Sequence, residues 1–86
     1  GRVMSEVDVT NGFMPNCETD FEHDAGGVRR IIQTFSNGVR VVFDNATCTA
    51  DISRNGRSVK TFSDVKIHDW GNIVFEAQSL TDSLNR

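Results

Sequence analysis

The sequence predicts an α+β fold, namely an antiparallel β-meander of about five to six strands capped by one C-terminal amphipathic helix. Short apolar, β-branched runs separated by turn residues fill the middle of the chain, and apolar residues at helical spacing fill its end. A sheet with one apolar face needs a cover, and a helix packed on that face is a stable solution for a small domain. The 86 residues, 37% hydrophobic and 24% charged, suit one such domain with a modest core.

The N-terminal part, residues 1–27, carries the weakest pattern. Alternation at Val3, Val7 and Val9 predicts a strand over residues 5–10, and the turn residues that follow predict a loop. Four acidic residues lie in this loop: Glu18, Asp20, Glu22 and Asp24. We expect residues 1–27 to form an N-terminal strand and acidic loop, and residues 28–86 the meander plus helix, in a single domain overall. Because no Met opens the chain, we expect it to be cut from something longer.

The middle of the chain predicts four strands joined by tight turns. The runs cover residues 28–35, 39–43, 47–53 and 57–62. The turns contain Asn37-Gly38 and Asn55-Gly56, and Asn-Gly supplies the positive φ angles of a two-residue hairpin loop. By alternation, two apolar sets share one face: Val39, Val41 and Phe43, then Cys48, Ala50 and Ile52. One face of the sheet is therefore expected to be buried and the other wet.

The C-terminal segment predicts the covering helix. Its apolar stripe consists of Trp70, Ile73, Val74, Ala77, Leu80, Thr81 and Leu84. This spacing is typical of an amphipathic helix, with Asp69 as a candidate N-cap. Gly71 and the β-prone Ile73-Val74-Phe75 favour an alternative, a hairpin over residues 65–77. The longer periodicity favours the helix over the hairpin.

No motif predicts an enzyme, a metal site or a cofactor. Four residues with ligand chemistry for zinc are present: Cys17, His23, Cys48 and His68. Their spacing lacks the close pairs of structural zinc sites. The alternating acidic residues from Asp20 lack the glycine and the glutamate of a calcium loop, because Ala25 and Ile31 stand at those positions. Nucleophile elbows and phosphate-binding loops are missing from the sequence as well.

Composition narrows the partner class to proteins. Nine Lys and Arg against twelve Asp and Glu give a net charge of −3, and the dispersed basic residues do not predict nucleic-acid binding. The longest apolar runs have three residues, Val41-Val42-Phe43 and Ile73-Val74-Phe75, far short of a membrane span. Two cysteines favour an intracellular location, although a small extracellular binding module with a Cys17–Cys48 bridge and a glycan on Asn45 stays open as an alternative.

An interaction module needs a docking surface, and we expect it on the helix stripe and the neighbouring strands. Phe35, Phe62 and Phe75 are apolar residues that the predicted core leaves over. The predicted partner-binding residues are Phe35, Val39, Val41, Phe62, Trp70, Val74 and Phe75. Partner binding in a groove between sheet and helix is one common mode of peptide recognition.

Two features resemble the polo box family. The segment Val41-Val42-Phe43-Asp44-Asn45-Ala46 is similar to its strand end, and Asn55-Gly56 to its later hairpin, within a match over residues 28–84. The resemblance implies a six-stranded meander with one helix, at the C-terminus of a polo-like Ser/Thr kinase of the centriole-duplication type. It further implies a non-catalytic, cytoplasmic domain at the centriole or centrosome that binds a helical or coiled-coil segment of a scaffold protein, with homodimers in some members.

A second resemblance stays open. The units that begin at Phe35, Phe43 and Phe62 are similar to the glycine-turn β-meander of a centriolar scaffold family. This resemblance implies a free-standing sheet that binds an extended peptide. It requires a further strand pair where the first interpretation places the helix, so the conformation of residues 65–77 separates the two.

Overall fold

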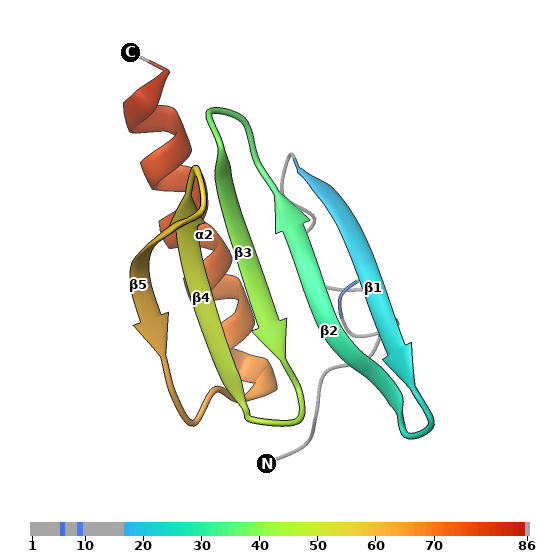
Figure 1. Ribbon diagram of the computed structural model, residues 1–86. Coiled ribbons are helices and arrows are strands. Elements are labelled where there is room, and N and C mark those ends of the chain that lie inside the picture. Colours follow the sequence, from blue (N-terminus) through green and yellow to red (C-terminus); the bar gives the residue numbers. More distant parts are fainter. Residues whose placement is uncertain (1–5, 7–8, 10–16, 86) are drawn as a thin grey trace.

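The computed structural model describes residues 6, 9 and 17–85 and shows a five-stranded antiparallel sheet followed by a helix (Figure 1). Neighbouring strands follow one another in the chain, so the sheet order is β1-β2-β3-β4-β5. The elements are β1 (Glu18–Asp24), β2 (Gly27–Thr34), β3 (Val39–Asp44), β4 (Thr49–Arg54), β5 (Arg57–Phe62), the 3₁₀ helix η1 (Ile67–Asp69) and α2 (Trp70–Leu84). This architecture confirms the predicted α+β meander capped by one helix.

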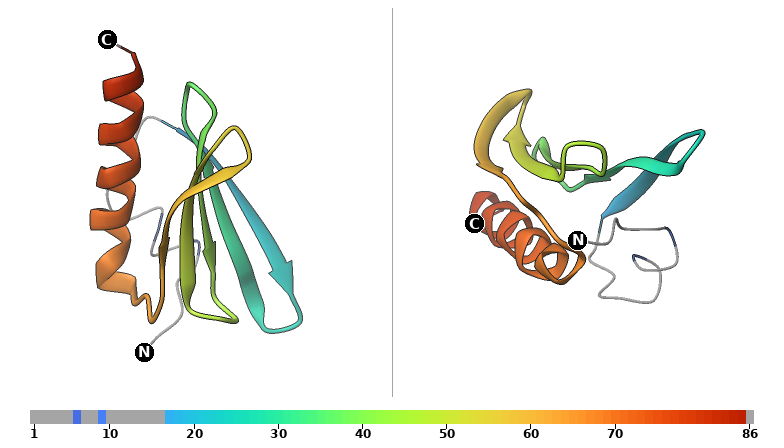
Figure 2. Two further views of the ribbon diagram at one scale, coloured as in Figure 1. Left: turned by 60° about the vertical axis from the view of Figure 1, so that its left-hand side comes forward. Right: turned by 90° about the horizontal axis from the view of Figure 1, so that it is seen from below.

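The helix α2 lies along one face of the twisted sheet (Figure 2). The structure confirms the helical prediction for Trp70–Leu84, and the alternative hairpin over residues 65–77 is wrong. Its buried positions match the predicted stripe at Trp70, Ile73, Val74, Ala77 and Thr81. Burial of this stripe on the sheet outweighs the β propensity of three residues, because a helix of this length gains most of its stability from tertiary packing.

The core fills the space between α2 and the facing side of the sheet. Its buried apolar residues are Val9, Ile31, Phe35, Val39, Val41, Phe43, Ala50, Ile52, Trp70, Ile73, Val74 and Ala77. One polar contact lies inside it, where the Trp70 indole Nε1 donates a hydrogen bond of 3.3 Å to Oε1 of the buried Gln33. That bond satisfies the indole and fixes the start of the helix against β2.

Two turns are built by Asn-Gly pairs, as predicted. Asn37 and Gly38 have φ angles of 60° and 76°, and Asn55 and Gly56 have φ angles of 53° and 82°. Two consecutive positive φ angles match the twist of the flanking strands in a tight hairpin. In the β4–β5 hairpin Arg54 pairs directly with Arg57, so the return is as short as a hairpin allows.

The acidic segment is a strand, so the predicted loop is wrong there. Residues 18–24 form β1, which pairs with β2 in a hairpin that crosses residue 27, the predicted limit of the N-terminal part. Only Phe21 of β1 packs against the core, while Glu22 makes an ion pair with Arg30, with Oε1 2.7 Å from Nε. The acidic residues made this strand hard to predict, because Asp and Glu are depleted in β-strands. On an edge strand, however, charged side chains are favourable because they discourage pairing with other chains.

Three local predictions are corrected. The strand predicted for residues 47–53 is β4, which begins at Thr49, because Cys48 adopts a positive φ of 55° in the turn before it. Asp69 occupies the N-cap position of α2, as predicted, but its side chain makes no cap hydrogen bond there, since its Oδ2 accepts the backbone N–H of Lys66 at 2.9 Å. The strand predicted for residues 5–10 lies mostly outside the described residues, and the two described there, Glu6 and Val9, are helical.

Candidate functional site

The candidate site is a groove between the edge strand β5 and the helix α2, here called the α2–β5 groove. One hollow of about 600 Å³ is lined by Phe62, Ser63, Val65, Asp69, Asn72, Ile73, Phe75 and Glu76. A second hollow of about 310 Å³ is lined by Ile52, Val59, Lys60, Phe75, Glu76, Ser79 and Leu80. Phe75 and Glu76 line both hollows, so the two lie next to each other along α2 and β5.

Exposed apolar side chains mark this groove. Phe75 is 66% exposed and Val59 is 56% exposed, and they are the exposed large hydrophobic residues found in the described part of the chain. Both line the same groove. Isolated surface hydrophobics are common, but two on the walls of one hollow are typical of an interaction site.

The local structure explains why these two side chains are exposed. On α2, Phe75 follows the buried pair Ile73 and Val74 and so falls off the apolar stripe. On β5, Ile52 pairs with Lys60 and Ser53 with Ser58, which leaves Val59 as the extra residue of a β-bulge. A bulge at an edge interrupts the ladder, and here it coincides with the exposed Val59.

An ion pair crosses the groove. The Lys60 Nζ lies 3.0 Å from Oε1 and 3.3 Å from Oε2 of Glu76, and 5.1 Å from the centroid of the Phe62 ring. Both side chains of the ion pair are about half exposed, at 55% and 45%. Solvent screens such a pair, so its contribution to stability is small; its effect is to set a positive charge on the strand wall opposite a negative charge on the helix wall.

The structure divides the predicted partner-binding residues into two groups. Phe35, Val39, Val41, Trp70 and Val74 are buried in the core. A partner cannot reach them while α2 covers the sheet, so we remove these five from the candidate surface. Their apolar spacing, which suggested contact with a partner, is the same spacing that packs the core.

The other two predicted residues, Phe62 and Phe75, do line the α2–β5 groove. Sequence reasoning missed Val59, Lys60, Glu76 and Leu80. The sequence did offer one signal for Val59 and Lys60: the last strand of a meander is an edge strand, so one side of it is open to a partner. The bulge that exposes Val59 left no trace in the sequence pattern.

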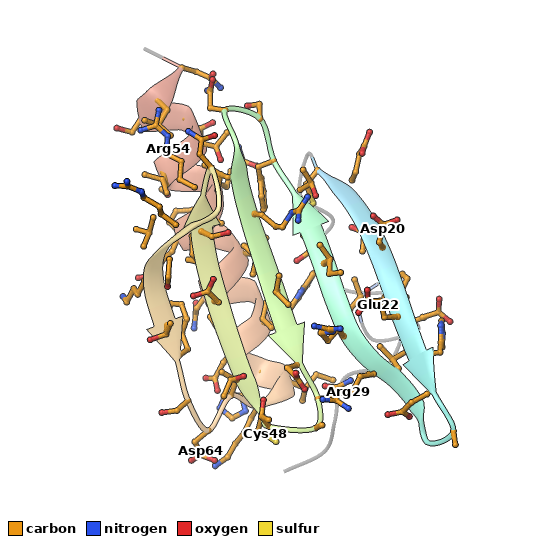
Figure 3. All side chains as sticks on the ribbon, in the orientation of Figure 1. Asp20, Glu22, Arg29, Cys48, Arg54 and Asp64 are labelled. Carbon is orange, nitrogen blue, oxygen red and sulfur yellow. The ribbon has the colours of Figure 1, made fainter. Side chains whose placement is uncertain are left out.

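The cysteines do not form a bridge. Cys17 and Cys48 are both free. Cys17 precedes Glu18, which pairs with Thr34, whereas Cys48 lies at the other end of the sheet, before Thr49 (Figure 3). The Cys17–Cys48 bridge of the extracellular alternative is therefore not formed in this structure. Burial raises the pKa of the Cys17 thiol, against a smaller lowering by its contact with the Thr19 hydroxyl, so Cys17 is a poor nucleophile.

The remaining candidate chemistry is dispersed. His23 lies 3.3 Å from a Glu6 carboxylate oxygen and His68 lies 3.4 Å from one of Asp69, all four being side chains with solvent contact. Within residues 6, 9 and 17–85, no group of three or more His, Cys, Asp or Glu side chains is placed to hold a metal ion. In that same part of the chain, no helix combines the length and apolar character needed to cross a membrane.

The side chain of Asn45, the first residue of the glycosylation sequon, is engaged in a hydrogen bond within the protein. The Asn45 side-chain Nδ2, the atom that a glycan would modify, donates a hydrogen bond of 2.8 Å to the carbonyl of Val28. Its backbone N–H donates to the carbonyl of Arg29, also at 2.8 Å. Asn45 thus ties the β3–β4 turn to β2.

Comparisons of this chain with protein-family models, curated proteins and solved structures gave no match.

Proposed function

We propose that this chain is a non-catalytic protein-interaction module of polo-box type, whose α2–β5 groove binds a helical or coiled-coil segment of a scaffold protein. The observation that carries the proposal is the pairing of exposed Phe75 and Val59 on opposite walls of one groove. The sequence resemblance supports the polo-box type, and so does the antiparallel meander capped by one helix, although the resemblance implies six strands and the described residues form five. A cytoplasmic location at the centriole or centrosome belongs to the same proposal.

A helical partner suits the groove better than an extended one. A strand that adds to β5 needs a regular row of backbone donors and acceptors along its edge. The bulge at Val59 interrupts that row. The groove behind the edge, by contrast, offers apolar contacts to side chains spaced along one helical face, which is the helix-in-groove mode of recognition.

The test is a titration of ¹⁵N-labelled protein with a set of synthetic amphipathic heptad-repeat peptides, followed by NMR. We expect chemical-shift changes centred on Val59, Lys60, Phe75, Glu76 and Leu80. Phe75→Glu places a charge at an exposed anchor and is expected to weaken binding about tenfold or more with the fold intact. Ser83→Glu adds the same charge to an exposed position of the same helix outside the groove, and is expected to bind as the wild type does.

Three results contradict the proposal. The first is shift changes centred on the other face of the sheet, around Ile32 and Val42. The second is a complete lack of binding by every peptide in the set. Equal affinities of the Phe75→Glu and Ser83→Glu proteins likewise count against the groove.

A further inference from the structure

Two tight turns of the sheet contain the same chemically labile dipeptide. Asn37-Gly38 and Asn55-Gly56 lie at the end of the sheet where α2 ends (Figure 1), and their asparagines have φ angles of 60° and 53°. Asparagine is a thermolabile residue, and a following glycine, which lacks a Cβ, leaves its backbone nitrogen open to the asparagine side chain. A third pair, Asn11-Gly12, lies outside the described residues. The two described turns share dipeptide and backbone conformation, so they can be compared directly.

The reaction at an Asn-Gly pair is an intramolecular substitution that uses only water and hydroxide from the solvent. The glycine N–H gives its proton to hydroxide, and the nitrogen forms a bond to the asparagine Cγ. The Cγ–Nδ2 bond breaks, and the amide nitrogen takes up a proton and leaves as ammonia. Water then opens the cyclic succinimide at one of its two carbonyls, which gives aspartate or isoaspartate. The rate depends on how freely the side chain reaches the attacking geometry.

The structure ties the side chain of Asn37 to the end of α2. The Asn37 Nδ2 donates a hydrogen bond to the Asn85 Oδ1. The Asn85 Nδ2 in turn donates to the Ser36 Oγ at 3.4 Å. The leaving group of Asn37 is therefore held by a hydrogen bond that must break before the ring can close.

The side chain of Asn55 has no such tie. Its backbone N–H donates to the Gly38 carbonyl at 3.0 Å, and its Oδ1 lies against Gly38, where a Cβ would collide with it. In the described part of the chain, its side-chain Nδ2 makes no hydrogen bond. The residue is also exposed, so the leaving group of Asn55 is open to solvent.

We propose that Asn55 is a site of spontaneous deamidation in the folded protein, and that Asn85 protects Asn37 from the same reaction. Loss of one typical hydrogen bond changes a rate by about fivefold, so Asn37 reacts about fivefold more slowly than Asn55. The product carboxylate lies in the turn between Arg54 and Arg57, which face each other across the hairpin, and opposite charges placed together there are favourable. The inference does not depend on the proposed function, because the reaction needs no partner.

The test is incubation of the whole folded chain in mildly alkaline buffer. Mass spectrometry of peptides follows the aspartate and isoaspartate formed at each asparagine over time. We expect conversion at Asn55 to be faster than conversion at Asn37 by about fivefold. In urea the tie between Asn37 and α2 is lost, and the two rates are expected to converge.

Asn85→Ala tests the protection of Asn37 directly. Removal of the Asn85 amide releases the Asn37 Nδ2, so conversion at Asn37 is expected to accelerate about fivefold and to approach that at Asn55. Ser83→Ala changes an exposed residue in the same last turn of α2, and both rates are expected to stay as in the wild type. Circular dichroism checks that each variant keeps its fold.

Three outcomes overturn the inference. Equal rates at Asn37 and Asn55 in the folded wild type would show that the tie to Asn85 gives no protection, and this comparison needs no variant. An unchanged rate at Asn37 in Asn85→Ala would place the protection elsewhere. Conversion of Asn55 in urea but not in the folded chain would show that the positive-φ turn itself prevents ring closure.

Discussion

Asp44 organises the β3–β4 connection with one carboxylate oxygen. Its Oδ1 accepts the backbone N–H groups of Ala46 at 2.9 Å and Thr47 at 3.3 Å, and the Arg29 Nε at 3.3 Å. Burial acts to raise the pKa of Asp44, but the hydrogen bonds from Ala46, Arg29 and Thr47 together lower it below its ordinary value. The ionised form is therefore the one that holds this turn.

The lowered pKa of Asp44 predicts a pH-dependent contribution to stability. A carboxylate with a lower pKa in the folded state stabilises the fold above its unfolded pKa of about 3.9, and this contribution is lost as pH falls through the folded pKa. Asp44→Asn is expected to reduce the free energy of unfolding by about 1 kcal/mol at pH 7. The difference from the wild type narrows as pH falls below about 4. Urea unfolding at pH 7, 5 and 3 measures it.

Asp20→Asn removes an exposed carboxylate from the edge strand β1 and serves as the control for that experiment. It should change the free energy of unfolding by less than about 0.5 kcal/mol. A difference between Asp44→Asn and wild type that stays constant from pH 7 to pH 3 contradicts the role given to the charge.

Two glycines are expected to respond to alanine with opposite signs. Gly38 has a φ of 76°, and a Cβ there would collide with the side chain of Asn55. Gly38→Ala is expected to destabilise the protein by about 1–2 kcal/mol or more. Gly71 lies in α2 with open space around its Cα, so Gly71→Ala is expected to stabilise it, by up to about 1 kcal/mol. The thermal midpoints of the two variants test this expectation. Midpoints that both rise or both fall relative to wild type would contradict the backbone conformations described for Gly38 and Gly71.

At the scale of elements, α2 has two distinct sides. Ile73 is 3% exposed and faces the sheet, whereas Phe75, two residues later, is 66% exposed. Ile73→Ala is expected to cost about 2–4 kcal/mol of stability, because it leaves a cavity in the core. Phe75→Ala is expected to change stability by less than about 0.5 kcal/mol, since the ring buries little surface in the monomer. Denaturant unfolding at low protein concentration measures both.

A large stability loss in Phe75→Ala, with Ile73→Ala close to wild type, would mean that α2 is rotated about its axis relative to this structure. The comparison of Phe75→Ala with Ile73→Ala also serves as a control for the binding experiments. Phe75 can be used as a probe of the groove because its replacement leaves the helix docked on the sheet.

At the scale of the whole molecule, the fold depends on noncovalent packing between the sheet and α2. Cys17 and Cys48 are free and lie at opposite ends of the sheet. We therefore expect a reductant to leave the thermal midpoint unchanged within about 1 °C. Thiol titration of the unfolded chain should find both thiols free. A lower midpoint in reductant, with thiols detected only after reduction, would show a bridge and overturn this arrangement.

The sequence by itself determined the elements whose signals are local. The Asn-Gly pairs at residues 37–38 and 55–56 fixed two hairpins, because few other residues accept two consecutive positive φ angles. The periodicity over residues 70–84 fixed the helix and its buried face, because only a helical conformation places all the apolar residues of this segment on one face that can be buried. The architecture of the meander and its cap follows from these signals.

Only the tertiary structure decided what the core leaves exposed. Phe35, Val41 and Phe75 are all apolar in the sequence, yet two are buried and one is exposed. For these three residues the difference arises from the position of α2 on the sheet, and the exposure of Val59 arises from the bulge in β5. Both features depend on contacts between residues far apart in the chain. Likewise β1 became a strand because β2 offered it a partner, although its own residues favour a loop. Local sequence sets the tight turns and the helix, whereas long-range packing makes β1 a strand and decides which surfaces remain for a partner.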